Sequence, residues 1–183
     1  MYPLIRFATQ TLKSRKQSAT LADTHVTTVR CWPWDIDPWM ELNNGRTLTL
    51  YDLGRVPYFI QVGAIDVMKK HNWRVTVAGV SVRYRRRITA FEKITIATKF
   101  IGWDDRFFYV DQSLWKKNGD CANQVLVRSA LVGQSGIVNP TEFAEAYGWQ
   151  GPRPELPDWA LKWVDAENAR PWPPENSPLA VVP

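Results

Sequence analysis

The sequence predicts an α+β protein in which one long helix packs on a five-stranded antiparallel sheet. The first observation is an alternation of apolar and polar residues at 24–32, which is typical of a strand. The second is a helical spacing of apolar residues that begins at Gly45. The third is a series of four further alternating segments, whose short connections favour antiparallel neighbours. The predicted order is therefore strand, helix and four-stranded meander.

The strands of the meander carry regular alternation. In the first of them, Val80, Val82 and Tyr84 alternate with serine and arginine. Asn118 and Gly119 separate the last two strands, and both residues tolerate the positive φ of a tight hairpin turn. The strands are expected at residues 74–88, 93–103, 106–117 and 121–132.

The helix after the first strand has clear start signals. Asn43 and Asn44 are good N-cap residues. Its apolar stripe includes Gly54, where the missing side chain lets a helix approach a sheet closely. Pro57 lies on the same stripe and is expected to kink the helix or to begin a second turn. A shorter helix is expected at 64–71.

Prolines and tryptophans divide the chain into parts. Nine of the 13 prolines and four of the 10 tryptophans lie after residue 139. Because prolines at this density interrupt helices and central strands, we expect one short helix at 140–147 and then an irregular tail that wraps the core. The expected parts are an amphipathic segment at 1–22, a central domain at 23–136 and a C-terminal helix and tail at 137–183.

One helix can cover only one face of a five-stranded sheet. The other face must be covered either by the tail or by a second copy of the chain. The second alternative predicts a dimer.

The composition excludes several classes of protein. Hydrophobic residues make up 45% of the chain and aromatic residues 13%, which excludes disorder throughout. The net charge of +5 is smaller than nucleic-acid binding favours, so no nucleic-acid partner is expected. Cys31 and Cys121 lie far apart in the sequence, which indicates reduced thiols and a cytoplasmic location. His25 and His71 have no second ligand at a metal-binding spacing, so no metal site is expected.

Residues 1–16 combine apolar side chains with a basic end that includes Lys13, Arg15 and Lys16. A secretory signal places its positive charge before the apolar stretch, so a short amphipathic helix is the better interpretation. This helix either packs on the domain, which we favour, or makes weak contact with a membrane surface.

Three carboxylates precede the long helix. Asp35, Asp37 and Glu41 come shortly before its N-terminus, where free backbone N–H groups and the helix dipole stabilise negative charge. A carboxylate beside such donors supplies a base or nucleophile together with an oxyanion stabiliser, which is the minimum for acyl transfer or hydrolysis. The alternative is that the carboxylates only interact favourably with the helix dipole.

The stretch DIDPWMELNNGRTLTLYDLGR at 35–55 resembles a family signature. It is similar to that of hot-dog-fold acyl-CoA thioesterases of the 4-hydroxybenzoyl-CoA thioesterase type. The closer match is the thioesterase-like branch that reads roughly WDxDxxxHxNNGRYLxLMDLGR. The resemblance continues through VSVRYRRRI, FEKITIATKFIGWDDRFFYVDQ and GIVNP, and it covers about residues 23–148.

The resemblance implies a hot-dog fold, in which the sheet wraps around the central helix, and hydrolysis of the thioester of an acyl- or aryl-CoA. Asp37 matches the family's nucleophile or general base, and Asn43 and Asn44 match its asparagine pair. Coenzyme A enters as part of the substrate, with no separate cofactor. A homodimer or homotetramer is implied, with the active site between protomers. Backbone N–H groups of residues 43–45 are expected to hold the oxyanion, and the expected substrate contacts include Trp39, Met40 and Gly45.

Three positions depart from the family motif. Glu41 replaces the usual histidine, Met40 replaces a glycine, and Thr47 replaces a tyrosine. Glu41 retains the capacity to act as a base. The same changes motivate a second hypothesis, a catalytically weak or inactive protein that binds acyl-CoA or acts as a scaffold.

The run of arginines is the main positive feature. Arg83, Arg85 and Arg87 are expected on one face of a strand. They either form a solvated face that protects a sheet edge or bind the phosphates of coenzyme A.

Overall fold

The computed structural model describes residues 3–14 and 19–174. The N-terminal amphipathic helix is present, and residues 1, 2, 15 and 16 of the segment in which it was expected lie outside the described residues. The elements are α1 (Leu4–Ser14), β1 (Thr24–Arg30), the 3₁₀ turn η1 (Pro33–Asp35), α2 (Asn44–Gln61), α3 (Ala64–Lys70), β2 (Arg74–Tyr84), β3 (Lys93–Trp103), β4 (Phe108–Lys116), β5 (Cys121–Gly133), β6 (Gly136–Val138), α4 (Pro140–Tyr147) and α5 (Asp158–Ala169).

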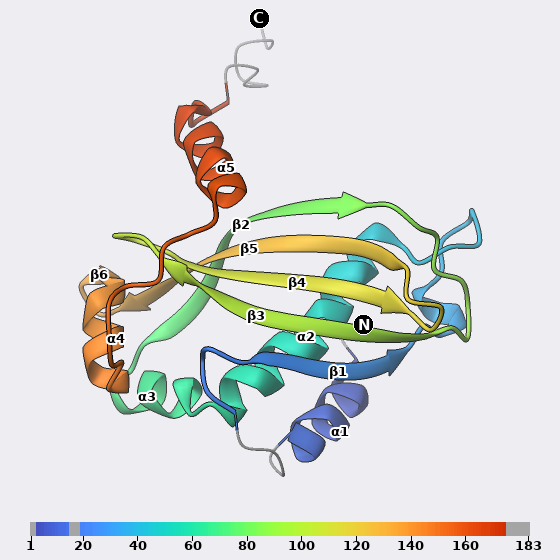
Figure 1. Cartoon of the computed structure of the whole chain (residues 1–183), viewed down its shortest axis with the longest axis horizontal. Helices are drawn as coiled ribbons and strands as arrows, with labels where there is room; N and C mark the ends of the chain where they lie inside the picture. Colours follow the sequence, from blue (N-terminus) through green and yellow to red (C-terminus); the bar gives the residue numbers. More distant parts are fainter. Residues whose placement is uncertain (1–2, 15–18, 175–183) are drawn as a thin grey trace, which may run out of the picture.

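The sheet confirms the predicted fold class. Its strands follow the order β1-β3-β4-β5-β2, all pairs are antiparallel, and the short β6 adds to β5. Figure 1 shows the sheet curled around α2, with α3 and α4 at one end. This arrangement makes α2 the central helix of a hot-dog fold.

The central helix packs closely on the sheet. A Cβ atom at Gly54 would lie 2.9 Å from Cγ2 of Ile96 and 3.0 Å from Oγ1 of Thr98, so only glycine fits at this contact. Pro57 lies inside the helix, which continues past it as far as Gln61.

The expected strand at 74–88 is too long at its C-terminal end. β2 ends at Tyr84, because the backbone N–H groups of Arg85 and Arg86 both donate to the carbonyl of Ala122. Two donors on one acceptor break the alternation of the ladder. The pattern predicted that Arg83, Arg85 and Arg87 share one strand face. This prediction is wrong, because the strand ends before Arg85.

The prediction of an irregular tail is correct for residues 148–157 and 170–174 but wrong for residues 158–169, and residues 175–183 lie outside the described residues. Residues 158–169 contain no proline and form α5, which packs on the outer face of the sheet against Tyr109 and Leu126. The guanidinium of Arg128 lies between the rings of Phe107 and Trp163, at 4.5 and 5.3 Å from their centroids. The tail thus covers part of the face that α2 leaves open.

The two edges of the sheet differ. At the β1 edge, side chains of α1 donate hydrogen bonds to the carbonyls of Thr28 and Arg30. At the β2 edge no residue is buried, and the inward-facing Val75 and Val77 are 54% and 51% exposed. Within the part of the chain that the structure describes, the β2 edge is therefore an apolar surface that no other segment covers. None of the helices in the described residues is long and apolar enough to span a bilayer.

Candidate active site

The loop between η1 and α2 is a tight backbone hairpin. Ile36 and Leu42 form an antiparallel bridge. Inside it, the N–H of Asp37 donates to the carbonyl of Glu41 at 2.8 Å, and the N–H of Met40 donates to the carbonyl of Asp37 at 3.0 Å. These bonds fix the turn on which the predicted catalytic carboxylate lies.

Met40 adopts a left-handed backbone conformation with a φ of 60°. This conformation costs a residue with a side chain about 1–2 kcal/mol relative to glycine. The requirement explains why the related motif carries glycine here, and Met40 retains the turn at a cost in stability. Strain of this kind is common at functional sites.

The Asp37 carboxylate is oriented by the same turn. Its Oδ1 accepts the N–H of Trp39 at 2.9 Å and, more weakly, the N–H of Glu41 at 3.4 Å. The side chain is partly exposed and has no ion-pair partner among residues 3–14 and 19–174. Asp37 is therefore a positioned carboxylate that solvent can reach.

The start of α2 narrows the choice of oxyanion donor. Oδ1 of Asn43 accepts the N–H groups of Gly45 and Arg46 at 2.9 and 3.1 Å, which confirms Asn43 as the N-cap. The N–H of Asn43 donates to the carbonyl of Asp35. Two of the three expected oxyanion donors, the N–H groups of Asn43 and Gly45, are thus already used. Asn44 is exposed, and its N–H has no acceptor within the described part of the chain.

A polar pocket of about 230 Å³ opens beside Asn44. Glu41, Thr47 and Arg85 also line it, whereas Asp37 lies on the preceding turn, outside the lining. The structure therefore brings together Glu41 and Asn44 in one pocket, with Asp37 on the adjoining loop.

The three predicted phosphate-binding arginines lie in two places: Arg85 and Arg87 line the polar pocket, and Arg83 does not. Arg87 is held by the loop: its Nε lies 2.9 Å from Oε2 of Glu41, and its Nη2 donates to the carbonyl of Trp39 at 2.6 Å. Arg83 lines a separate groove on the outer face of the sheet, beside α5. Within the described residues the Arg85 side chain has no hydrogen-bond or ion-pair partner, whereas Arg87 in the same pocket is engaged by the loop.

Asp35 has a structural role that the sequence did not reveal. Its side chain is fully buried and accepts hydrogen bonds at 2.8 Å from Arg6 of α1 and at 2.8 Å from Arg46 of α2. Burial acts to raise the pKa of Asp35, but the backbone N–H of Trp32 and the two guanidinium groups outweigh it and lower the pKa. Asp35 therefore stays ionised and ties α1, η1 and α2 together.

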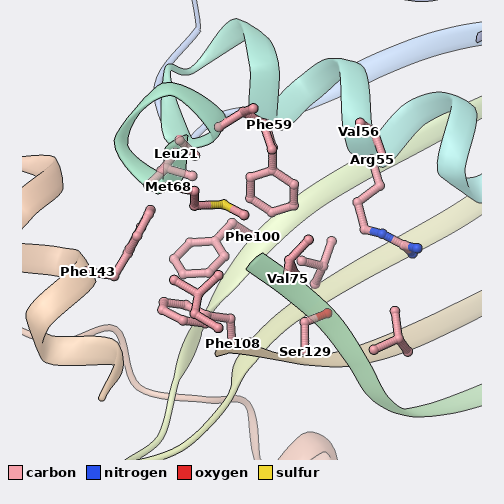
Figure 2. A pocket seen from close by; sticks show the side chains of 15 residues that line it. Leu21, Arg55, Val56, Phe59, Met68, Val75, Phe100, Phe108, Ser129 and Phe143 are labelled. Atoms are coloured by element: carbon pink, nitrogen blue, oxygen red, sulfur yellow. The ribbon is translucent and has the colours of Figure 1, made fainter. Parts of the chain in front are cut away.

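An apolar pocket of about 170 Å³ lies further along α2, between the helix and the β2 edge. Figure 2 shows Phe59, Phe100 and Phe143 gathered at one end and Arg55 at the other. Arg55 is engaged by Asp52, three residues earlier on α2, and by Oε1 of Gln112 at 2.9 Å. Local sequence patterns do not indicate this pocket, because its lining comes from eight segments of the chain that only the fold brings together.

Trp39 and Met40 line neither of these pockets and are 73% and 69% exposed. They form the tip of the loop. Burial raises the pKa of the Cys31 thiol to about 11, so this cysteine is a poor nucleophile. No group of metal-binding side chains occurs among the described residues.

The curled sheet around α2, with a positioned carboxylate before the helix, defines a hot-dog protein of the thioesterase type. The sequence model of the thioesterase-like superfamily matches residues 31–164, and the chain belongs to this superfamily. At this general level, the family and fold are those of thioester hydrolases.

The chain is also similar to individual proteins, to one in sequence and to two solved structures in fold. Protein THEM6 of Xenopus laevis is 29% identical over 164 residues, which cover 87% of this chain and 77% of that protein. The probable thioesterase YbaW of Escherichia coli superposes with a TM-score of 0.60 at 16% identity, over 67% of this chain and 95% of YbaW. DHNA-CoA thioesterase of Staphylococcus aureus has a TM-score of 0.59 at 14% identity, over 79% of this chain and 95% of that enzyme.

The substitution Met40→Gly should stabilise the protein. Glycine removes the steric cost of the left-handed conformation, so we expect the free energy of unfolding to rise by about 1 kcal/mol. Urea denaturation measures this change. Met68→Gly is the control, because Met68 lies within α3 and the same substitution should destabilise there. If Met40→Gly instead lowers the free energy of unfolding, the contacts of the Met40 side chain stabilise the protein by more than its backbone conformation destabilises it.

The substitution Asp35→Asn should destabilise the protein in a pH-dependent way. Loss of the buried carboxylate leaves two arginines without their partner, at a cost of about 3–5 kcal/mol near pH 7. Because folding lowers the pKa of Asp35, its stabilisation is present above the unfolded pKa of about 4 and is lost as the pH falls through the folded pKa. The difference in unfolding free energy between wild type and variant should therefore shrink below about pH 4. Asp66→Asn, in an exposed pair with Lys69, should change stability by less than about 0.5 kcal/mol at any pH.

Proposed function

We propose that the protein hydrolyses the thioester of an acyl- or aryl-CoA. The observation that supports this is the Asp37 carboxylate, held by the N–H of Trp39 on a strained turn directly before the N-terminus of α2. A fixed, solvent-accessible carboxylate is suited to activate water or to attack the thioester carbonyl. The superfamily and the DHNA-CoA thioesterase of similar fold support the same class of substrate.

In this proposal the N–H of Asn44 stabilises the oxyanion. It occupies the first position of α2 and has no acceptor among the described residues, while the helix dipole favours negative charge there. Asn43 acts indirectly, because its side chain caps the helix and fixes the direction of that N–H. Glu41 is ion-paired with Arg87, which favours a positioning role for Glu41 over that of the base.

The proposed active site lies between two copies of the chain. The uncovered β2 edge can pair with β2 of a second copy in an antiparallel arrangement. Such pairing places the first half of β2 beside the last half of β2 in the partner. The first half borders the apolar pocket through Val75 and Val77. Tyr84 at that end borders the polar pocket. Each site would then combine the polar pocket of one copy with the apolar pocket of the other.

The apolar pocket is suited to the acyl or aryl group. Except for Arg55 and Ser129, its lining is hydrophobic, so it offers no polar partner to most of an aliphatic or aromatic chain. Arg85 in the polar pocket is suited to a phosphate of coenzyme A. The division of chemistry between the two pockets matches an amphiphilic thioester.

A second candidate is a protein that binds acyl-CoA without hydrolysing it. Glu41 stands where the motif has histidine and is held by Arg87, so the usual acid–base partner is absent. Under this hypothesis acyl-CoA raises the thermal unfolding temperature but releases no thiol. Thiol release from an acyl-CoA panel, measured together with thermal shift, distinguishes the two candidates.

The substitution Asp37→Asn should lower thioesterase activity about a hundredfold or more. Asparagine keeps an oxygen that can accept the N–H of Trp39, so the loop should retain its structure while the basic group is lost. Thiol release over an acyl-CoA panel measures the effect, with circular dichroism to confirm folding. The control Asp105→Asn, at an exposed turn, should remain fully active.

Two results would contradict the proposed hydrolase. One is a wild-type protein that releases no thiol from any acyl-CoA in a broad panel. The other is an Asp37→Asn variant with unchanged activity, which would place the catalytic group elsewhere.

The substitution Val80→Lys should convert a dimer into a monomer. Val80 lies on β2, is 41% exposed and does not line either pocket, so a lysine there adds charge to the proposed interface only. Light scattering on a sizing column should show half the wild-type mass. Because the site is shared, thiol release from acyl-CoA should be lost as well. Val26→Lys on β1, at the opposite edge, should leave both unchanged. A monomeric wild-type protein that is active would refute the shared site.

A further inference from the structure

Helix α1 packs on the domain through Phe7 and through two polar side chains. The Arg6 guanidinium donates at 2.8 Å to Oδ2 of Asp35 and at 2.8 Å to the carbonyl of Arg30. One turn further, Nε2 of Gln10 donates to the carbonyl of Thr28 at 3.0 Å. These three bonds turn the polar side of the helix toward the protein.

The opposite side of α1 is apolar and exposed. Ile5 and Leu12 share one side of the helix and are 84% and 63% exposed. Leu4 is 69% exposed, and Ala8 between them is also exposed, while Phe7 turns inward against the core. A surface helix ordinarily buries its apolar face, whereas α1 partly buries Phe7 and leaves its other four apolar side chains exposed.

Aromatic side chains extend this apolar surface. Ile5 lines a groove together with Trp32. Trp32 stacks on Trp34 with ring centroids 5.4 Å apart and meets Phe91 edge-on at 6.1 Å. Trp34 and Phe91 are 65% and 57% exposed. Together we call the following six residues the apolar patch: Leu4, Ile5, Ala8, Leu12, Trp34 and Phe91.

The charges around the apolar patch are positive. Lys13, Arg30 and Lys93 are exposed and have no ion-pair partner within the described residues. The carboxylates that flank the two aromatic residues are neutralised, Asp35 by two arginines and Glu92 by a lysine. The patch is therefore apolar at its centre and basic at its rim.

We propose that the apolar patch is a docking surface for an anionic lipid bilayer, with α1 parallel to the membrane plane. Tryptophan, phenylalanine and aliphatic side chains enter the headgroup region, and the basic rim contacts lipid phosphates. A second copy of the chain is less suitable as an occupant, because it presents the same positive rim and would be repelled.

Docking in this orientation has a consequence for the candidate active site. Trp34 precedes Asp37 by three residues in the same loop, and Asp35 ties that loop to α1. The loop would therefore lie at the lipid surface. The proposal does not depend on the thioesterase hypothesis, because membrane docking requires no catalytic group.

Vesicle sedimentation tests the proposal with the full chain. We expect the protein to pellet with vesicles that contain phosphatidylserine and to remain in solution with phosphatidylcholine alone or at high salt. The double variant Ile5→Ser and Leu12→Ser should weaken binding about tenfold or more, since two large apolar side chains no longer enter the interface. Its fold should persist, because Arg6 and Gln10 remain.

A matched control comes from α5. Trp159 and Leu161 are 46% and 45% exposed, so Trp159→Ser with Leu161→Ser removes similar apolar area away from the patch and should bind vesicles like wild type. Equal weakening by both double variants would overturn the proposal, as would a wild type that binds neither kind of vesicle. A fall in oligomeric mass in the α1 variant, with unchanged vesicle binding, would assign the patch to a second copy instead.

Discussion

The buried carboxylate of Asp35 is the interaction on which the candidate site depends. It is fully enclosed and is balanced by Arg6, Arg46 and the N–H of Trp32. A buried charge tolerates no loss of these partners, so α1, η1 and the first turn of α2 must keep one relative arrangement. The hairpin that carries Asp37 begins one residue after Asp35 and is therefore anchored at its base. The position of Asp37, the proposed catalytic carboxylate, is in this sense set by a different carboxylate, two residues earlier.

Local patterns predicted the fold because each element carries its own signal. Asn43 caps α2, Gly54 marks the close contact with the sheet, and Asn118 with Gly119 closes the β4–β5 hairpin. The end of β2 was not predictable in this way, because it depends on the carbonyl of Ala122 in another strand. The proline content of the tail as a whole did not predict α5, because residues 158–169 contain no proline while the residues on either side do.

The arrangement of the candidate site was predictable only in part, because some of its contacts join residues that are distant in the sequence. Asp37 and the asparagine pair were identified from a contiguous motif, and the structure places them on adjoining turns. The role of Asp35 depends on Arg6, 29 positions earlier, which no local pattern connects to it. Likewise, the bulge after β2 divides the arginine run. Arg83, before the bulge, lies on the outer face of the sheet, and Arg87, beyond it, contacts the loop. Long-range contacts, rather than residue types, decide where these side chains lie.

The described chain leaves two apolar surfaces open, and their chemistry differs. The β2 edge offers unpaired backbone N–H and carbonyl groups beside its valines, so the occupant that satisfies it must supply a strand. The face of α1 offers no backbone groups, because its hydrogen bonds are made within the helix and its polar side chains are used at the β1 edge. A surface of that kind needs only an apolar phase with negative charge at its boundary. The two surfaces therefore suit two different partners, a second copy at β2 and a lipid surface at α1.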